Sequence, residues 1–158
     1  MIYISSFDII HISDEDIFIE KEKQMSNWTH VAGIIRVDYI KWDDDPELDF
    51  DKLIGKECLW GSDYEVFEDA DKHPESYLPM GSEGSLQKSV WINSNDSHVS
   101  RYTVSIFGDL RDHDSADEII EWFKSKCESL GDRVRQATIT VNNEYSGTKS
   151  YTHKEWGE

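Results

Sequence analysis

The chain has 158 residues, of which 33 are Asp or Glu and 16 are Lys or Arg, so its formal net charge is −17 at pH 7. This charge argues against DNA, RNA or an anionic membrane surface as a direct ligand, because their phosphates would be repelled. The length suits a single domain, and an aromatic content of 12% excludes the composition of a disordered acidic chain.

Residues 1–24 place isoleucines in a partly alternating pattern around a polar turn at 13–16. The pattern predicts an extended N-terminal arm or hairpin before a single α+β domain over 25–158. Two interpretations of the arm stay open: a strand for oligomerisation or partner binding, and an ordinary edge strand of the same sheet. Met25 is an alternative start of the chain.

The sequence contains neither a secretory signal pattern nor a run of about 18 apolar residues. Its two cysteines, Cys58 and Cys127, lie far apart in no metal-binding spacing. We therefore expect reduced, buried thiols in a protein that stays in the cytoplasm of the cell that makes it.

Residues 28–40 predict a strand, because apolar and polar side chains alternate along them. Asp45 and Pro46 then predict the start of a short amphipathic helix that ends at Gly55. The acidic stretch 61–79 predicts one or two further helical turns.

Residues 86–92 and 100–107 are rich in β-branched and aromatic side chains and predict an antiparallel hairpin. Ser115 and Glu118 form a capping box, so a helix is expected to begin there and to end at Gly131.

Two more strands are expected over 134–141 and 148–153. From residue 28 onwards, the core order is strand, helix, strand, strand, helix, strand. This order predicts a ferredoxin-like split βαββαβ fold, with an antiparallel sheet and two helices on one face.

The first candidate site is an acidic surface, because the segment from Asp38 to Glu75 holds 14 carboxylates against 4 lysines. Gathered on one face, they would imitate a phosphate backbone and occupy a basic cleft of another protein. The alternative is an ordinary solvated face. The candidate partner-binding residues are Asp43, Asp44, Asp45, Glu47, Asp63, Glu65, Glu68, Asp69 and Asp71.

The second candidate is the glycine- and serine-rich segment 81–85. Its backbone N–H groups and hydroxyls could cradle a phosphate, although Glu83 in its middle opposes an anion. Together with an aromatic ring for base stacking, it predicts a nucleotide site. The candidate ligand-binding residues are Trp28, His30, Ser82, Ser85, Lys88 and Arg111.

The third candidate is the polar cluster 109–114, between the last hairpin strand and the capped helix. Asp109, Asp112 and His113 suggest a site for Mg²⁺ or Mn²⁺ and metal-dependent hydrolysis. The alternative is that the carboxylates of Asp112 and Asp114 complement the helix dipole while Arg111 pairs with a neighbour.

Three segments, 28–31, 81–87 and 107–112, resemble small proteins of unassigned function encoded by bacteriophages and prophages. The resemblance covers residues 25–153 and implies a context, in which small acidic proteins block host nucleases or capture nucleotide signals of host immunity. It implies no activity and no functional residues.

With no recognisable catalytic set, we expect a non-enzymatic inhibitor without a cofactor. It would act as a counter-defence protein that binds a basic host protein, such as a nucleic-acid-binding immune effector. The alternatives are a module that sequesters a cyclic-nucleotide-type signal, and a metal-dependent hydrolase. Homo-oligomer formation stays open.

Overall fold

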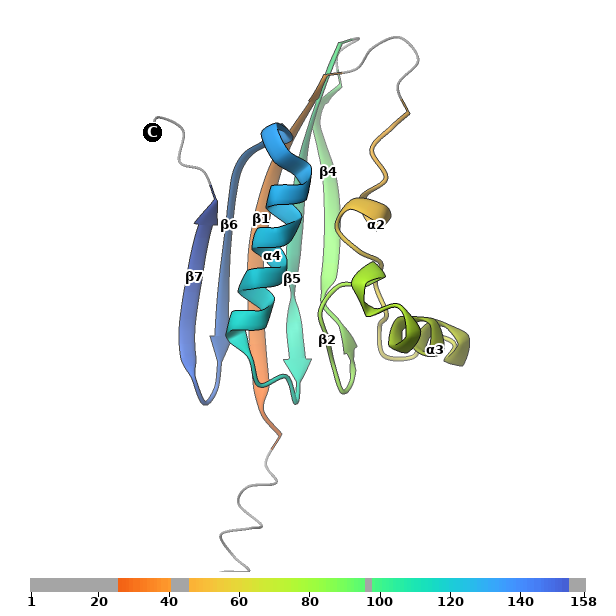
Figure 1. The fold of residues 1–158 in the computed structure, drawn as a ribbon, viewed down its shortest axis with the longest axis vertical. Helices are drawn as coiled ribbons and strands as arrows, with labels where there is room; N and C mark the ends of the chain where they lie inside the picture. Colours follow the sequence, from red (N-terminus) through yellow and green to blue (C-terminus); the bar gives the residue numbers. More distant parts are fainter. Residues whose placement is uncertain (1–25, 41–45, 96–97, 154–158) are drawn as a thin grey trace, which may run out of the picture.

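A five-stranded antiparallel sheet dominates the computed structural model, which describes residues 26–40, 46–95 and 98–153. The strand order is β4-β5-β1-β6-β7, and helix α4 covers one face (Figure 1). The mixed α+β class is thus confirmed. The bounds are β1 Trp28–Ile40, β4 Gln87–Asn95, β5 Val99–Arg111, α4 Ala116–Leu130, β6 Val134–Asn143 and β7 Gly147–His153.

The central strand β1 pairs with β5 on one side and β6 on the other. Its burial alternates residue by residue, so that Val31, Ile35, Val37 and Tyr39 face α4 and are buried. A strand with period-2 burial has one face on the core and one toward solvent. The sheet therefore has a second face, the open face, which α4 does not cover.

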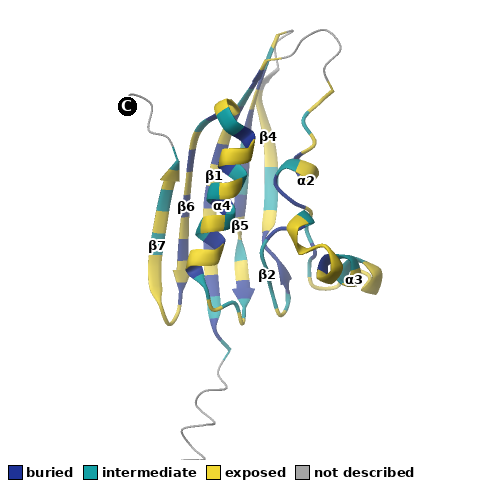
Figure 2. Cartoon of the chain, viewed as in Figure 1, coloured by how far each residue is buried: buried dark blue, intermediate teal, exposed yellow. Residues whose placement is uncertain are grey.

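Helix α4 begins and ends as the sequence predicted. The Ser115 hydroxyl accepts a hydrogen bond from the Glu118 N–H at 3.2 Å, and Gly131 follows the last turn with φ +60°. The inward stripe of the helix packs on the sheet while its outer side is exposed (Figure 2). The buried stripe consists of Ala116, Ile119, Phe123, Cys127 and Leu130.

The connection from β1 to β4 is built from short elements rather than from one crossover helix. Its bounds are α2 Phe50–Leu53, α3 Tyr64–Lys72, the 3-10 helix η1 Pro74–Ser76, β2 Met80–Gly81 and β3 Gly84–Ser85. Helix α2 starts later than predicted, since Asp49 caps it by accepting from the N–H groups of Asp51 and Lys52. The expected cap, Asp45, lies outside the described residues.

Residues 56–80 form a small unit beside β4, which we call the acidic lobe (Figure 1). It has its own apolar cluster of Cys58, Ala70 and Tyr77, with Val66, Phe67 and Met80 packed against it. Backbone hydrogen bonds from Ser85 N to Cys58 O (2.7 Å) and from Leu86 N to Pro79 O (2.9 Å) fasten the lobe to the sheet.

Both cysteines are free and buried, as expected. Burial raises the pKa of the Cys127 thiol to about 12. None of the helices in the described part of the chain has the length and apolarity needed to cross a membrane. The predicted arm over 1–24 lies outside the described residues.

Candidate functional site: an acidic lobe with exposed aromatic rings

The charge of the acidic lobe is uneven because α3 is amphipathic. Seven carboxylates stand against two lysines in residues 56–80. The apolar side of α3 is turned to the lobe's core by Val66, Phe67 and Ala70, so the opposite side of the helix carries residues that face solvent. Those outward residues include Glu65, Glu68 and Asp71, which are spaced three apart and so share one side of the helix.

Four of the lobe's carboxylates have no ion-pair partner among the described residues: Asp63, Glu65 and Asp71, and also Glu57, which instead accepts from the Lys88 N–H. Glu68 differs, since its Oε1 lies 2.6 Å from Nζ of Lys72. Asp63, Glu65, Glu68 and Asp71 are all exposed. The helix therefore presents a cluster of negative charge that the rest of the described protein does not neutralise.

Asp69 forms contacts that hold the lobe together. Its Oδ2 accepts a 2.7 Å hydrogen bond from the Tyr77 hydroxyl, and Nζ of Lys56 lies 3.8 Å from the same oxygen. The hydrogen bond from Tyr77 lowers the pKa of Asp69, and the same bond raises the pKa of Tyr77 to about 12. This contact joins α3 to the segment that leads back to the sheet.

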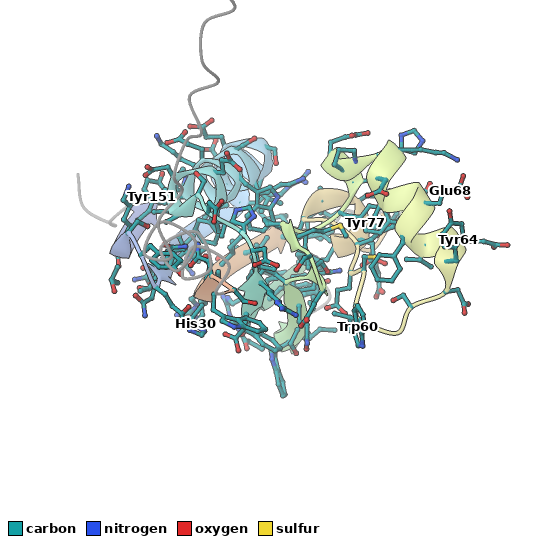
Figure 3. The ribbon with its side chains drawn as sticks, turned by 90° about the horizontal axis from the view of Figure 1, so that it is seen from below. His30, Trp60, Tyr64, Glu68, Tyr77 and Tyr151 are labelled. Atoms are coloured by element: carbon teal, nitrogen blue, oxygen red, sulfur yellow. The ribbon has the colours of Figure 1, made fainter. Side chains whose placement is uncertain are left out.

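Two aromatic rings stand out from the same lobe. Trp60 is 77% exposed and Tyr64 is 80% exposed, although rings of this size are usually largely buried. Figure 3 shows Tyr64 and Glu68 on the outer side of the lobe and Tyr77 on its inner side. Trp and Tyr are the residues most enriched among those that dominate binding energy at protein interfaces.

Sequence reasoning missed these two rings. The signal was present, because Trp60 does not belong to an apolar periodic pattern. It lies within a turn that is closed by a hydrogen bond from Ser62 N to Leu59 O at 2.9 Å. Tyr64 is the first residue of α3, on the side opposite the buried stripe.

Of the predicted acidic surface, the structure gathers Asp63, Glu65, Glu68, Asp69 and Asp71 on α3 and its N-terminal cap. Glu47 is exposed but precedes α2, away from α3. Asp43, Asp44 and Asp45 lie outside the described residues.

The open face of the sheet has a different charge. Strands β1 and β5 give it three arginines, Arg36, Arg101 and Arg111, against two carboxylates, Asp38 and Asp109. His30 lies on this face with Nδ1 2.6 Å from Oδ1 of Asp109. Carboxylates are therefore unevenly distributed, with a dense group on the lobe and few on the open face.

The predicted nucleotide site is only partly assembled. Trp28 lies opposite Arg111 in the register of β1 and β5, and Ser82 is close by, since its N–H donates to Arg111 O at 2.8 Å. The Arg111 guanidinium is already paired with Glu83, which raises the pKa of Arg111. His30 belongs to the separate pair with Asp109 on the open face.

Ser85 and Lys88 are used inside the protein. The Ser85 hydroxyl accepts from Cys58 N at 2.8 Å and donates to Leu86 O at 2.7 Å. The Lys88 side chain is 9% exposed and its Nζ lies 2.7 Å from both Gly55 O and Asp51 Oδ1. An anion in this loop would have to displace these internal partners.

The geometry of 109–114 does not favour metal binding. Asp112 accepts from the Ser82 hydroxyl at 2.8 Å, and Nδ1 of His113 faces Met80 O at 3.1 Å. Within the ranges that the structure describes, no three His, Cys, Asp or Glu side chains come together as a metal site. Asp114 instead accepts from Asn27 Nδ2 at 2.9 Å, as part of a polar network at the end of the sheet.

The chain matches no protein-family model, no curated protein and no solved structure.

Proposed function

We propose that this protein is a non-enzymatic binder that docks its acidic lobe on a basic protein. In the context that the sequence resemblance implies, the partner is a nucleic-acid-binding effector in the cytoplasm of the host, and binding blocks its cleft. The observation that carries the proposal is the group of unpaired carboxylates Asp63, Glu65 and Asp71 beside the exposed rings of Trp60 and Tyr64.

The combination favours arginine over lysine on the partner. A guanidinium can stack on an aromatic face while its N–H fork pairs with a carboxylate, and both kinds of contact are available on the lobe. Stacking on an exposed ring is worth about 0.5–1 kcal/mol, and about 2 kcal/mol when water is excluded. The carboxylates add attraction at long range, which speeds encounter and weakens as salt screens it.

We further propose that the sheet is an extended ferredoxin-like arrangement. The spatial order β4-β5-β1-β6 supports this, since it is the strand order of that topology, with β7 as an additional edge strand. Within it, the short elements between β1 and β4, including α2, take the place of the first helix. This arrangement leaves the acidic lobe as an insertion beside the sheet.

The test compares two charge-neutralising substitutions, Glu65→Gln on the lobe and Glu128→Gln on α4. Both residues are exposed helical glutamates without an ion pair among the described residues, so the change in net charge is the same. A host protein captured by the wild-type chain from a host-cell lysate is purified, and its affinity for each variant is measured.

We expect Glu65→Gln to weaken binding several-fold and Glu128→Gln to have a much smaller effect. Trp60→Ala should weaken binding at least as strongly as Glu65→Gln, since exposed tryptophans at interfaces often contribute about 2 kcal/mol or more. Equal effects of the two glutamine substitutions would mean that only net charge matters, and the lobe would then not be the docking site.

A further inference from the structure

Exposed apolar side chains gather at one edge of the sheet. Of the nine large hydrophobic residues exposed in the described ranges, six lie on β1, β4 and β5. Three of these are consecutive on β4: Val90 (39% exposed), Trp91 (61%) and Ile92 (59%). Because β4 is an outermost strand, this apolar run lies where another strand can pair with the sheet.

The backbone of β4 is oriented for such pairing. Lys88 N donates to Oε1 of Glu57 at 2.6 Å, so this N–H points away from β5. In an antiparallel ladder the N–H and C=O groups of alternate residues point to the same side. The N–H and C=O groups of Val90 and Ile92 therefore point outward too, and no described residue forms a hydrogen bond with them.

The central residues of the same edge carry no charge, and the Glu57 carboxylate lies only at its end, on the Lys88 N–H. Residues 89–93 are Ser, Val, Trp, Ile and Asn, and the charged residue before them, Lys88, has its side chain turned to Asp51 and Gly55. In a chain with a net charge of −17, residues 89–93 of one copy can face residues 89–93 of another without bringing two carboxylates together. A basic partner would instead be drawn to the acidic lobe. An uncharged apolar strand fits this edge, and β4 of a second copy is such a strand.

We propose that two copies of this chain pair through their β4 edges, antiparallel and around a two-fold axis at Trp91. Each Trp91 then lies opposite Trp91 of the second copy, and Val90 faces Ile92 of the second copy across a hydrogen-bonded pair. Identical strands satisfy each other in this way because a two-fold interface is self-complementary.

Two features of the structure select this register. Glu57 covers the Lys88 N–H, which ends the free edge on one side. A register shift between Ile92 and Ser94 ends the regular ladder on the other. Only Val90 and Ile92 remain as outward-pointing residues between these limits, and their midpoint is Trp91.

The first test is sedimentation of the full chain over a range of protein and salt concentrations. We expect a dimer at tens of micromolar protein, and a stronger dimer in higher salt, because salt screens the repulsion between two negatively charged copies. The acidic lobe predicts the opposite trend for a basic partner, so the two proposals can fail separately.

Two substitutions at the edge should give a monomer. Val90→Pro removes an outward N–H without removing a hydrogen bond to β5, which an edge strand tolerates. Trp91→Lys places like charges opposite each other at the axis. Trp60→Ala, the matched change at an exposed tryptophan of the lobe, should leave the dimer unchanged.

The register is tested by cysteine crosslinking, for which the native thiols are buried. Trp91→Cys should give a covalent dimer on mild oxidation, since directly opposite residues in a non-hydrogen-bonded pair have Cα atoms about 4.5 Å apart. Ser89→Cys should not form this crosslink, because Ser89 of the second copy lies several residues further along the paired strand. The proposal is overturned if the chain is a monomer at all concentrations, whether the β4 edge is bare or covered by residues 1–24. It is also overturned if the dimer persists after the substitutions Val90→Pro and Trp91→Lys. Crosslinking of Ser89→Cys as readily as of Trp91→Cys would also overturn it.

Discussion

Replacing Tyr77 by Phe tests whether one hydrogen bond holds the acidic lobe together. The substitution removes only the hydroxyl, which donates to Oδ2 of Asp69 at 2.7 Å, and leaves the ring beside Cys58 and Ala70. Hydrogen bonds to charged groups contribute about 1.5–3 kcal/mol to stability. The Asp69 side chain is 45% exposed, so solvent screening places the expected loss at the lower end, about 1.5 kcal/mol.

The pH dependence gives a second readout of this bond. The pKa of Tyr77 is raised from 10.0 to about 12, so the stabilisation is complete below pH 10 and is lost as the pH rises from 10 to 12. The pKa of Asp69 is lowered, so at acid pH the contribution is present above pH 3.8 and is lost as the pH falls further. The Tyr77→Phe variant should show neither the loss of stability at high pH nor the one at low pH.

The assay is urea unfolding of the wild type and of Tyr77→Phe at neutral pH and at pH 11, with amide hydrogen exchange to locate the change. At neutral pH the variant should be less stable, and exchange should accelerate in α3 (Tyr64–Lys72) more than in α4. At pH 11 the difference between the two proteins should shrink. The reasoning is refuted if the neutral-pH stabilities agree within about 0.5 kcal/mol, the usual range of a neutral surface change.

Three further predictions concern the scaffold and use unfolding or labelling. Ser115→Ala should cost about 1 kcal/mol, because the Glu118 N–H loses its cap, whereas an unchanged midpoint would show that the cap contributes nothing. Gly81→Ala should destabilise the β2–β3 hairpin, since a Cβ there would overlap the backbone carbonyl oxygen of Arg111; normal proteolytic resistance of the variant would contradict this. Cys127 should react with thiol reagents only upon unfolding, because it is buried and burial raises its pKa to about 12, and rapid labelling of the folded chain would refute it.

Much of the fold could be predicted because the signals were local. The alternation in residues 28–40 and the cap at Ser115 each specify their element within a few residues, and the strand and the helix both appear as predicted. The start of α2 was placed wrongly, since Asp45 and Asp49 are both acceptable caps in sequence and the helix begins after Asp49, where Phe50 packs against Tyr102.

The candidate site was predicted in part. Sequence placed the carboxylates of 63–71 on one acidic surface because of their density along the chain, and the helix of the structure then determines which of them share a side. It did not identify Trp60 and Tyr64, since exposure depends on how the lobe folds against the sheet. It also treated Lys88 as a free cation, whereas Asp51 and Gly55, more than 30 positions away in the sequence, occupy its ammonium.

The internal use of the loop 81–85 could not be read from its glycines and serines. Its N–H groups look available in sequence, yet Ser82 and Ser85 donate theirs to Arg111 and Cys58. Long-range backbone pairing of this kind leaves no local signature, because buried polar groups find whichever partners the tertiary structure supplies.

The most direct test of the proposed function is the affinity of the full chain for its captured basic partner as a function of salt concentration. Docking through Asp63, Glu65 and Asp71 predicts that affinity falls steadily as salt rises, and that removing these three charges flattens the slope. An affinity that does not change with salt, or a slope that survives their neutralisation, would contradict the acidic lobe as the binding surface.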